Sequence, residues 1–145
     1  MPHLIRAIIE DFAPHFAPDS TLVYAGDTGH LDAALLDGLG LAVASHAQMP
    51  DVVLYHGAKN RLLLIESATS HGPIDEPRRA GLAPLFAGST AGLLYVTAFP
   101  NRATMACSLG DIAWETEVWV ADAPSHLIHF DGQRFLGPYS PRQSR

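Results

Sequence analysis

The sequence predicts an α/β domain with a mixed central sheet flanked by helices. Apolar, β-rich runs alternate with amphipathic helical stretches along the chain, which is the pattern of α/β domains. Two of these runs, at 52–55 and 62–65, face each other across a short loop that contains glycine, as in a β-hairpin. Both runs are apolar throughout, which indicates strands that are covered on both faces.

The length and composition suit one soluble domain. The 145 residues can bury a core of their own, and 48% hydrophobic against 17% charged residues excludes a disordered chain. We therefore expect a single domain over 1–145, with an N-terminal helix and linker at 1–20 and a loose tail at 139–145. The single cysteine excludes an intramolecular disulfide framework. Without an apolar signal core or an apolar run of ~18–20 residues, the expected location is the cytoplasm.

The first half of the chain predicts two helices and short strands. A helix over 2–12 follows from apolar residues at helical spacing, and Pro14 is expected to stop it. A strand at 21–24 leads into a turn at 26–29. Gly40 is a plausible C-terminal stop for a second helix, and a further short strand is expected at 41–44. The apolar side of that second helix consists of Leu31, Leu35, Leu36 and Leu39.

The second half predicts the hairpin, two more helices and three more strands. Asp75 is expected to cap a helix that runs to about Phe86, in which Pro84 causes an end or a kink. A buried strand is expected at 93–97. Asn101 should cap a further helix to about Leu109, and late strands are expected at 117–121 and 127–130.

Two carboxylates stand at one end of the hairpin. If its centre lies between Ala58 and Lys59, Asp51 lies directly opposite Glu66 on the same face, with Cβ atoms about 4.5–5.5 Å apart. Two such carboxylates repel each other unless a cation lies between them, and Mg²⁺ takes one or two carboxylates. The alternative is that both are strand-end acids exposed to water. The pairing also depends on the assumed register, since a slip of one residue would place the two carboxylates on opposite faces.

These carboxylates also carry a resemblance. Pro50-Asp51 followed by Glu66 resembles the short PD-(D/E)XK nuclease motif, and longer stretches resemble the BsuBI/PstI restriction endonuclease family. The resemblance extends from about residue 20 to 138. Its stretches are 23–29 (VYAGDTG), 49–55 (MPDVVLY), 64–73 (LIESATSHGP), 95–102 (YVTAFPNR), 111–119 (DIAWETEVW), 126–132 (HLIHFDG) and 134–138 (RFLGP).

The resemblance implies a PD-(D/E)XK fold and Mg²⁺-dependent type II restriction cleavage of double-stranded DNA, with Mn²⁺ as a substitute ion. Asp51 and Glu66 fall on the two motif carboxylates, whose implied role is to hold the metal, with the Ser67 carbonyl as a further ligand. A homodimer is expected, because cutting two strands symmetrically requires two centres.

The chain departs from the family pattern at the motif lysine. Ala68 stands at that position, and the only lysine, Lys59, is expected in the hairpin turn, too far from Asp51. Gln48 is the first candidate for a catalytic replacement, since the family often has lysine there; glutamine can donate hydrogen bonds but carries no charge. Other candidates near the expected site are Asp27, Thr69 and His71.

These departures leave an alternative function open, a catalytically degenerate DNA-binding or partner-dependent subunit of a restriction or defence system. Full restriction enzymes of the family carry a further N-terminal helical domain, whereas about 20 residues precede the matching region here. That missing part, or a partner chain, would contribute to DNA binding.

The basic residues are few. Nine Lys and Arg face fifteen Asp and Glu, and the net charge of −6 disfavours broad clamping of a polyanion. A local patch is still compatible with this balance. Arg78 and Arg79, in the first turns of the helix after Asp75, and Arg102, after another strand, are the candidate DNA-phosphate contacts. Ordinary solvated arginines are the alternative.

Overall fold

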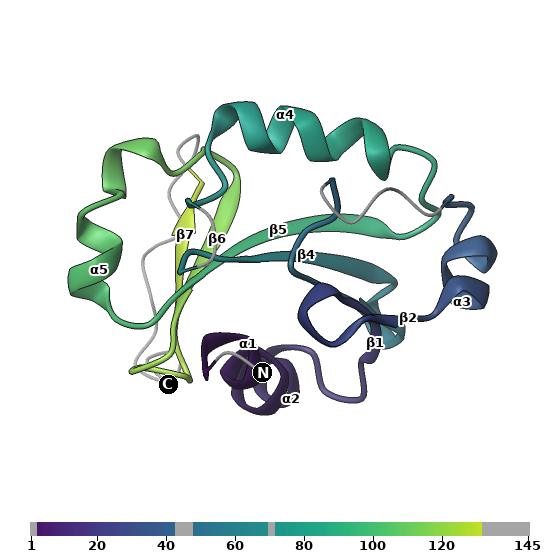
Figure 1. Cartoon of the computed structure of the whole chain (residues 1–145), viewed down its shortest axis with the longest axis horizontal. Coiled ribbons are helices and arrows are strands. Elements are labelled where there is room, and N and C mark those ends of the chain that lie inside the picture. The colour runs from purple at the N-terminus through teal and green to yellow at the C-terminus, as the bar shows by residue number, and fades with distance from the viewer. Residues whose placement is uncertain (1–2, 43–47, 70–71, 132–145) are drawn as a thin grey trace, which may run out of the picture.

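The computed structural model describes residues 3–42, 48–69 and 72–131. In these ranges, seven strands form one sheet in the order β2-β1-β3-β4-β5-β6-β7 (Figure 1). The pairs β4–β5 and β5–β6 are parallel and the others are antiparallel, so the predicted mixed sheet is confirmed. The strands are β1 (Thr21–Ala25), β2 (His30–Leu31), β3 (Val52–His56), β4 (Arg61–Ser67), β5 (Gly92–Phe99), β6 (Thr116–Val120) and β7 (Leu127–Phe130).

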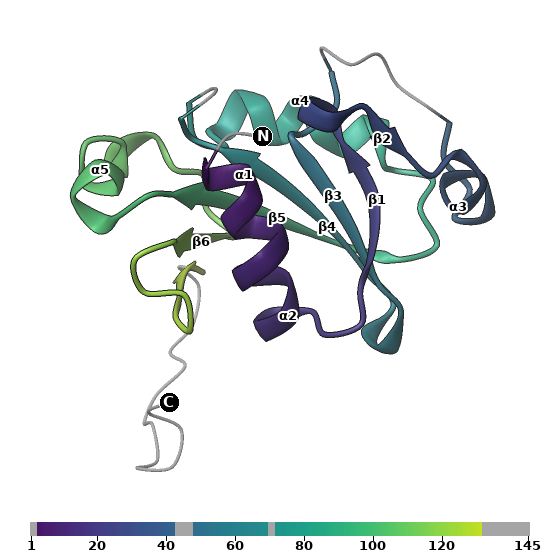
Figure 2. The same ribbon diagram turned by 60° about the horizontal axis from the view of Figure 1, so that its bottom comes forward.

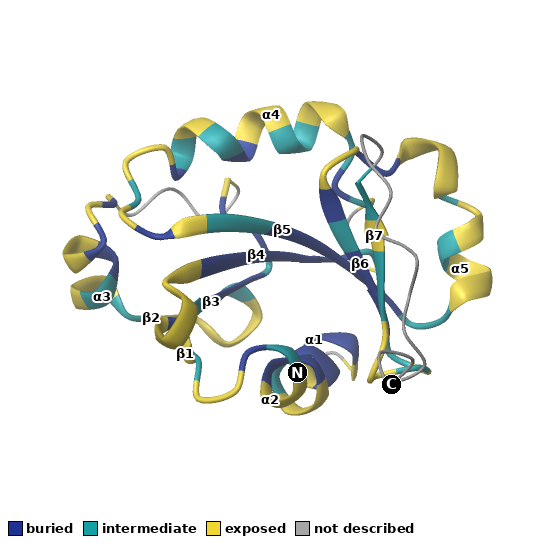
Figure 3. Ribbon diagram, turned by 180° about the vertical axis from the view of Figure 1, so that it is seen from behind, coloured by how far each residue is buried: buried dark blue, intermediate teal, exposed yellow. Residues whose placement is uncertain are grey.

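Helices cover both faces of the sheet (Figures 1 and 2). On one face, the N-terminal helices pack on alternate residues of β3 to β6, and Phe12 meets the fully buried Trp119 edge to face. On the other face, α3 and α4 pack on the intervening residues, among them Val53 and Leu64. Figure 3 shows buried strands between helices whose outer sides are exposed. The helices are α1 (His3–Ala7), α2 (Ala13–Phe16), α3 (Ala33–Gly38), α4 (Glu76–Leu85) and α5 (Arg102–Ala106).

Pro14 does not stop the first helix, and that prediction is wrong. A π-helical turn, Ile8–Phe12, follows α1 and leads directly into α2, where Pro14 occupies the first turn. The Ala13 amide donates to the Ile8 carbonyl, five residues back, so the wider turn absorbs the missing proline donor. The helical segment therefore extends to Phe16.

The region of the second helix agrees with the prediction only in part. Asp32 caps α3 through a 3.0 Å bond from the Leu35 amide, but Leu31 is exposed in β2 and does not line the helix. Gly40 follows the helix at φ +84°, and a Cβ there would lie 2.9 Å from the Gly88 carbonyl oxygen, so a glycine is required. Leu41 and Ala42 are not in a strand, and 43–44 lie outside the described residues.

The hairpin register is confirmed. Val52 pairs with Ile65 and Val53 with Leu64, which is the pairing predicted from a centre between Ala58 and Lys59. The turn is a short 3₁₀ segment, Gly57–Lys59, and closes at Asn60 with φ 51°. This register brings residues 51 and 66 to the same end of the two strands.

The remaining elements agree with the prediction except at their ends. Asp75 caps α4 as expected, and Pro84 lies in its last turn, one residue before the helix ends. Asn101 caps α5, which ends at Ala106, earlier than predicted. The tail at 139–145 lies outside the described residues. No helix in the described ranges has the length and apolarity that crossing a membrane would require.

Candidate active site

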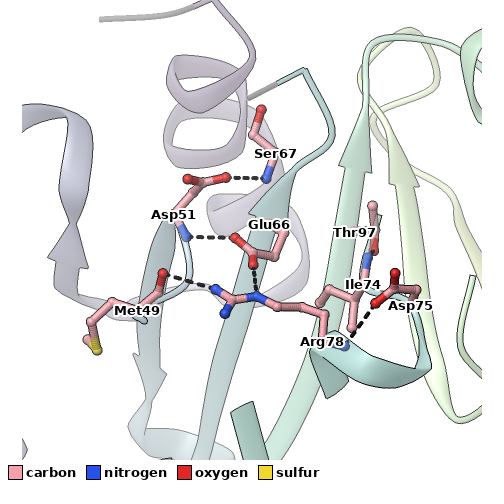
Figure 4. Close-up of polar contacts among 8 residues, drawn as sticks. All are labelled: Met49, Asp51, Glu66, Ser67, Ile74, Asp75, Arg78 and Thr97. Atoms are coloured by element: carbon pink, nitrogen blue, oxygen red, sulfur yellow. Dashed lines mark hydrogen bonds and ion pairs between the residues drawn. The ribbon is translucent and has the colours of Figure 1, made fainter. Parts of the chain in front are cut away.

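Asp51 and Glu66 lie next to each other at the end of the hairpin. Glu66 is the penultimate residue of β4 and is only 3% exposed, and Asp51 directly precedes β3. The Asp51 backbone N–H donates to Glu66 Oε1 over 3.1 Å (Figure 4). The alternation of the strands places both on the face that α4 covers, as for Val53 and Leu64.

Ser67 completes this side of the site through its backbone. Its N–H donates to Asp51 Oδ2 over 2.7 Å, which fixes the orientation of the Asp51 carboxylate. The Ser67 hydroxyl is hydrogen-bonded to that of Thr69, at 2.9 Å. The proposed ligand role of the Ser67 carbonyl stays a prediction.

Arg78 joins three segments at this point (Figure 4). Asp75 Oδ1 accepts from the Arg78 backbone N–H over 2.8 Å, which fixes the first turn of α4. The Arg78 Nε–H donates to Glu66 Oε2 in an ion pair, and Nη2 donates to the Met49 carbonyl over 3.1 Å. Both oxygens of Glu66 therefore accept hydrogen bonds from the chain itself.

Opposing effects act on the pKa of the Glu66 carboxyl group. Burial raises the pKa of its carboxyl group most, the Arg78 guanidinium opposes this, and the negative charge of Asp51 adds to the rise. The net result is a raised pKa. Burial also raises the pKa of the Tyr24 hydroxyl, with a further contribution from the charge of Asp51. The buried end of the hairpin therefore disfavours further negative charge.

The donor set suits a hard divalent cation. Magnesium prefers oxygen ligands and takes one or two carboxylates, with water and substrate phosphate in its other positions. Across the described ranges, no group of three or more His, Cys, Asp and Glu side chains could hold a metal ion, so the chain offers this carboxylate pair. The residues fit the ion on one condition, that it replaces Arg78 at Glu66 Oε2.

The other predicted site residues are more dispersed. Gln48 is exposed, one residue before the Met49 carbonyl that Arg78 binds. Arg79 does not join the carboxylate pair: its guanidinium lies over the Tyr95 ring, at 4.8 Å, and 3.7 Å from Glu115 Oε1. Arg102 is exposed at the start of α5, after the C-terminal end of β5. Since β4 and β5 are parallel, that end lies at the same edge of the sheet as Glu66.

The position of the motif lysine is apolar in the structure. Ala68 is half-buried and packs against the apolar cluster around Phe99 and Val118. Lys59 is exposed in the turn at the opposite end of the hairpin, as predicted. Asp27 is exposed in the turn after β1, and His71 lies outside the described residues.

Sequence reasoning missed the contact between Arg78 and Glu66. Arg78 was expected only as a phosphate contact. A signal was present: α4 begins shortly after β4 ends, so its first turn returns over the end of that strand. No sequence pattern, however, gives the direction of a long arginine side chain.

The chain is similar to known restriction endonucleases in sequence. Residues 2–133 match the family model "BsuBI/PstI restriction endonuclease domain". The chain is 64% identical over 140 residues to "Type II restriction enzyme BsuBI" of Bacillus subtilis. The aligned region covers 94% of this chain and 44% of that enzyme. The chain is 29% identical over 143 residues to "Type II restriction enzyme AplI" of Arthrospira platensis (strain NIES-39 / UTEX 3086 / IAM M-135), covering 92% of the chain and 44% of that relative.

A solved structure has the same fold. The "Structure of SdaI restriction endonuclease" is matched with a TM-score of 0.87 and 45% sequence identity, over 94% of this chain and 44% of that one. The predicted restriction-endonuclease-like fold is thereby confirmed. The chain spans less than half the length of the relatives it matches.

Proposed function

The chain belongs to the BsuBI/PstI restriction endonuclease family, and from that premise we propose that it acts as the catalytic domain of a type II restriction endonuclease, hydrolysing phosphodiester bonds of double-stranded DNA. One observation carries the proposal most directly. The confirmed register and the bond from the Asp51 amide to Glu66 Oε1 bring two carboxylates together at one edge of the sheet. Type II restriction endonucleases generally depend on divalent metal ions, and Mg²⁺ is the ion proposed here, with Mn²⁺ as a substitute.

The proposed site residues divide into metal ligands, a group for the attacking water and phosphate contacts. Asp51, Glu66 and the Ser67 carbonyl hold the ion, which when bound lowers the pKa of a coordinated water and offsets charge on the phosphate. Gln48 hydrogen-bonds the attacking water. Three arginines on the same side contact DNA phosphates and hold the strand in line, namely Arg78, Arg79 and Arg102.

The proposal extends to the organisation of the protein. Residues 1–145 form one nuclease domain that acts in the cytoplasm, and two copies cut the two DNA strands symmetrically as a homodimer. Since the chain spans 44% of the relatives, a further helical domain or a partner chain contributes to reading the target sequence.

Cleavage of supercoiled plasmid in Mg²⁺ or Mn²⁺ tests the proposal. Asp51→Asn and Glu66→Gln should each lower the rate of nicking by about 10²-fold or more, because each removes a ligand that stabilises transition-state charge. Asp37→Asn, which removes an exposed carboxylate on α3, is the matched control and should cut like the unmodified protein. Equal cutting by all four proteins would reject the assigned site.

A second function is favoured by two observations at the same site. Ala68 offers no cation, and Arg78 already bonds to Glu66. A catalytically degenerate DNA-binding or partner-dependent subunit would bind DNA without cutting it under any divalent ion. The plasmid assay together with a DNA-binding assay on the same samples separates this function from the first.

A further inference from the structure

The ion pair at Glu66 occupies the place that a bound metal would need. Glu66 Oε1 accepts from the Asp51 amide, and Oε2 accepts from Arg78 Nε. An incoming ion can gain Oε2 only if the Arg78 side chain leaves it. The Asp51 amide, in contrast, is part of the backbone next to β3 and cannot move away without disturbing the hairpin.

We propose that Arg78 is a latch on the carboxylate pair: its guanidinium neutralises Glu66 in the absence of metal and turns away when a divalent ion binds. The inference rests on the proposed function, because it needs an ion at Asp51 and Glu66. Arg78 is here a positioning residue for the metal, which goes beyond a phosphate contact.

The latch has a fixed base and a movable end. The Asp75 carboxylate holds the Arg78 backbone N–H in the first turn of α4, so motion is confined to the side chain. That side chain is 28% exposed, whereas the Glu66 side chain is 3% exposed, so solvent reaches the arginine far more than the carboxylate. The second bond of the guanidinium is to the neutral Met49 carbonyl, which water can satisfy after the arginine departs.

The latch also supplies the buried Glu66 carboxylate with a counter-charge when no metal is bound. A buried carboxylate without a counter-charge is costly, so Glu66 needs a cation in both states. Arg78 supplies it before the metal arrives and the metal supplies it afterwards. The released guanidinium then stands at the edge of the sheet where the phosphate is expected, with a positive charge that Ala68 does not provide.

Calorimetric titration with Mn²⁺, in the absence of DNA, tests the competition. Arg78→Gln should bind Mn²⁺ at least about tenfold tighter than the unmodified protein, because a charge-assisted bond no longer has to be broken first. Arg61→Gln removes the same charge from an exposed position at the opposite end of β4 and should leave the affinity unchanged. Equal or weaker binding by Arg78→Gln would overturn the latch, since a merely structural arginine gives weaker binding when removed.

A measurement on the unmodified protein covers the case in which the variant does not fold. Mg²⁺ added to ¹⁵N-labelled protein should shift the Arg78 Nε–H resonance and speed its exchange with water. A resonance unchanged at saturating Mg²⁺ would equally overturn the latch.

Glu66→Gln in the Arg78→Gln background separates the two proposals. One outcome is that the double variant does not bind Mn²⁺, while Arg78→Gln and the unmodified protein bind it with equal affinity. That outcome would reject the latch and keep the proposed metal site. Retained binding, or no Mn²⁺ binding by any of the proteins, would reject both.

Discussion

Glu66 is a single carboxyl group under opposing influences. Burial at the end of β4 and the neighbouring Asp51 raise its pKa, and the ion pair with Arg78 lowers it by less. The folded protein therefore binds a proton at Glu66 more tightly than the unfolded chain does. By linkage, the contribution of Glu66 to stability is fully present below its unfolded pKa, near 4.5, and is lost as the pH rises through the raised folded value.

Glu66→Gln should remove that part of the pH dependence. In metal-free buffer, the unfolding free energy of the unmodified protein should fall, relative to that of Glu66→Gln, as the pH rises upward from about 4.5. Urea denaturation of both proteins across this range measures the difference. A difference that does not change with pH, or that grows in the opposite direction, would show that the folded pKa is not raised.

Asp51 and Glu66 were predictable from the sequence because strand pairing is periodic. Once the hairpin centre was placed, every opposed pair followed, including the pair at the open end. Arg78 was not predictable in its contact with Glu66, because an arginine side chain reaches several directions from one backbone position and packing decides among them. The position of the Arg79 guanidinium over the Tyr95 ring was not predictable for the same reason.

The element that positions Arg78 is the first turn of α4. Its N-cap bond runs from the Arg78 amide to Asp75 Oδ1, so the residue that starts the helix also fixes the residue that binds Glu66. Ile74, just before, donates its amide to the Thr97 hydroxyl over 3.0 Å, which ties the approach to α4 to the buried face of β5. The geometry of the site thus depends on where this helix begins.

Asp75→Ala should lower the unfolding free energy by about 1 kcal/mol, because the cap bond is lost and a helix N–H is left without it. Asp75→Asn is the matched control and should stay within a few tenths of a kcal/mol, since asparagine caps about as well as aspartate. Chemical denaturation followed by circular dichroism measures both. Equal losses in the two variants would mean that charge, and not the cap bond, stabilises this helix.

Elements with a strong local signal were predicted best. The capped starts at Asp75 and Asn101 and the hairpin agree with the structure, because each depends on neighbouring residues. The expectation at Pro14 failed because tertiary packing of Phe12 and its neighbours favours a continuous helix, and a π turn accommodates the ring. Of the strand expected at 41–44, the described residues Leu41 and Ala42 are not in a strand, and Leu41 is instead buried in the apolar cluster that joins α3 and α4 to the sheet.

At the scale of the whole molecule, charge opposes the proposed substrate. A net charge of −6 repels DNA, and the carboxylates of Asp51 and Glu66 stand at the edge where a phosphate is expected. A bound divalent cation reverses the sign locally. DNA binding should therefore depend on the ion more than on the few arginines.

Binding of a fluorescent DNA duplex should be weak in chelator and should tighten by about tenfold or more when Ca²⁺ is added, since the ion places positive charge between the carboxylates and the phosphate. Fluorescence anisotropy measures the change, and Ca²⁺ is chosen to allow binding without cutting. Asp51→Asn and Glu66→Gln should abolish the stimulation. Equal binding with chelator and with Ca²⁺ would contradict an ion held by these two residues.

Asp51, Glu66 and Arg78 come from one stretch of the sequence, 51–78, in which α4 is the next described helix or strand after the β3–β4 hairpin. Little chain entropy is lost in bringing such near neighbours together, and contacts of low sequence separation form early in folding. A gene rearrangement that exchanged either flank of this stretch would carry the whole cluster across intact. The carboxylate pair and the arginine that bonds to it are thus encoded together in one segment that includes the start of α4, whereas Gln48, Arg79 and Arg102 lie outside it.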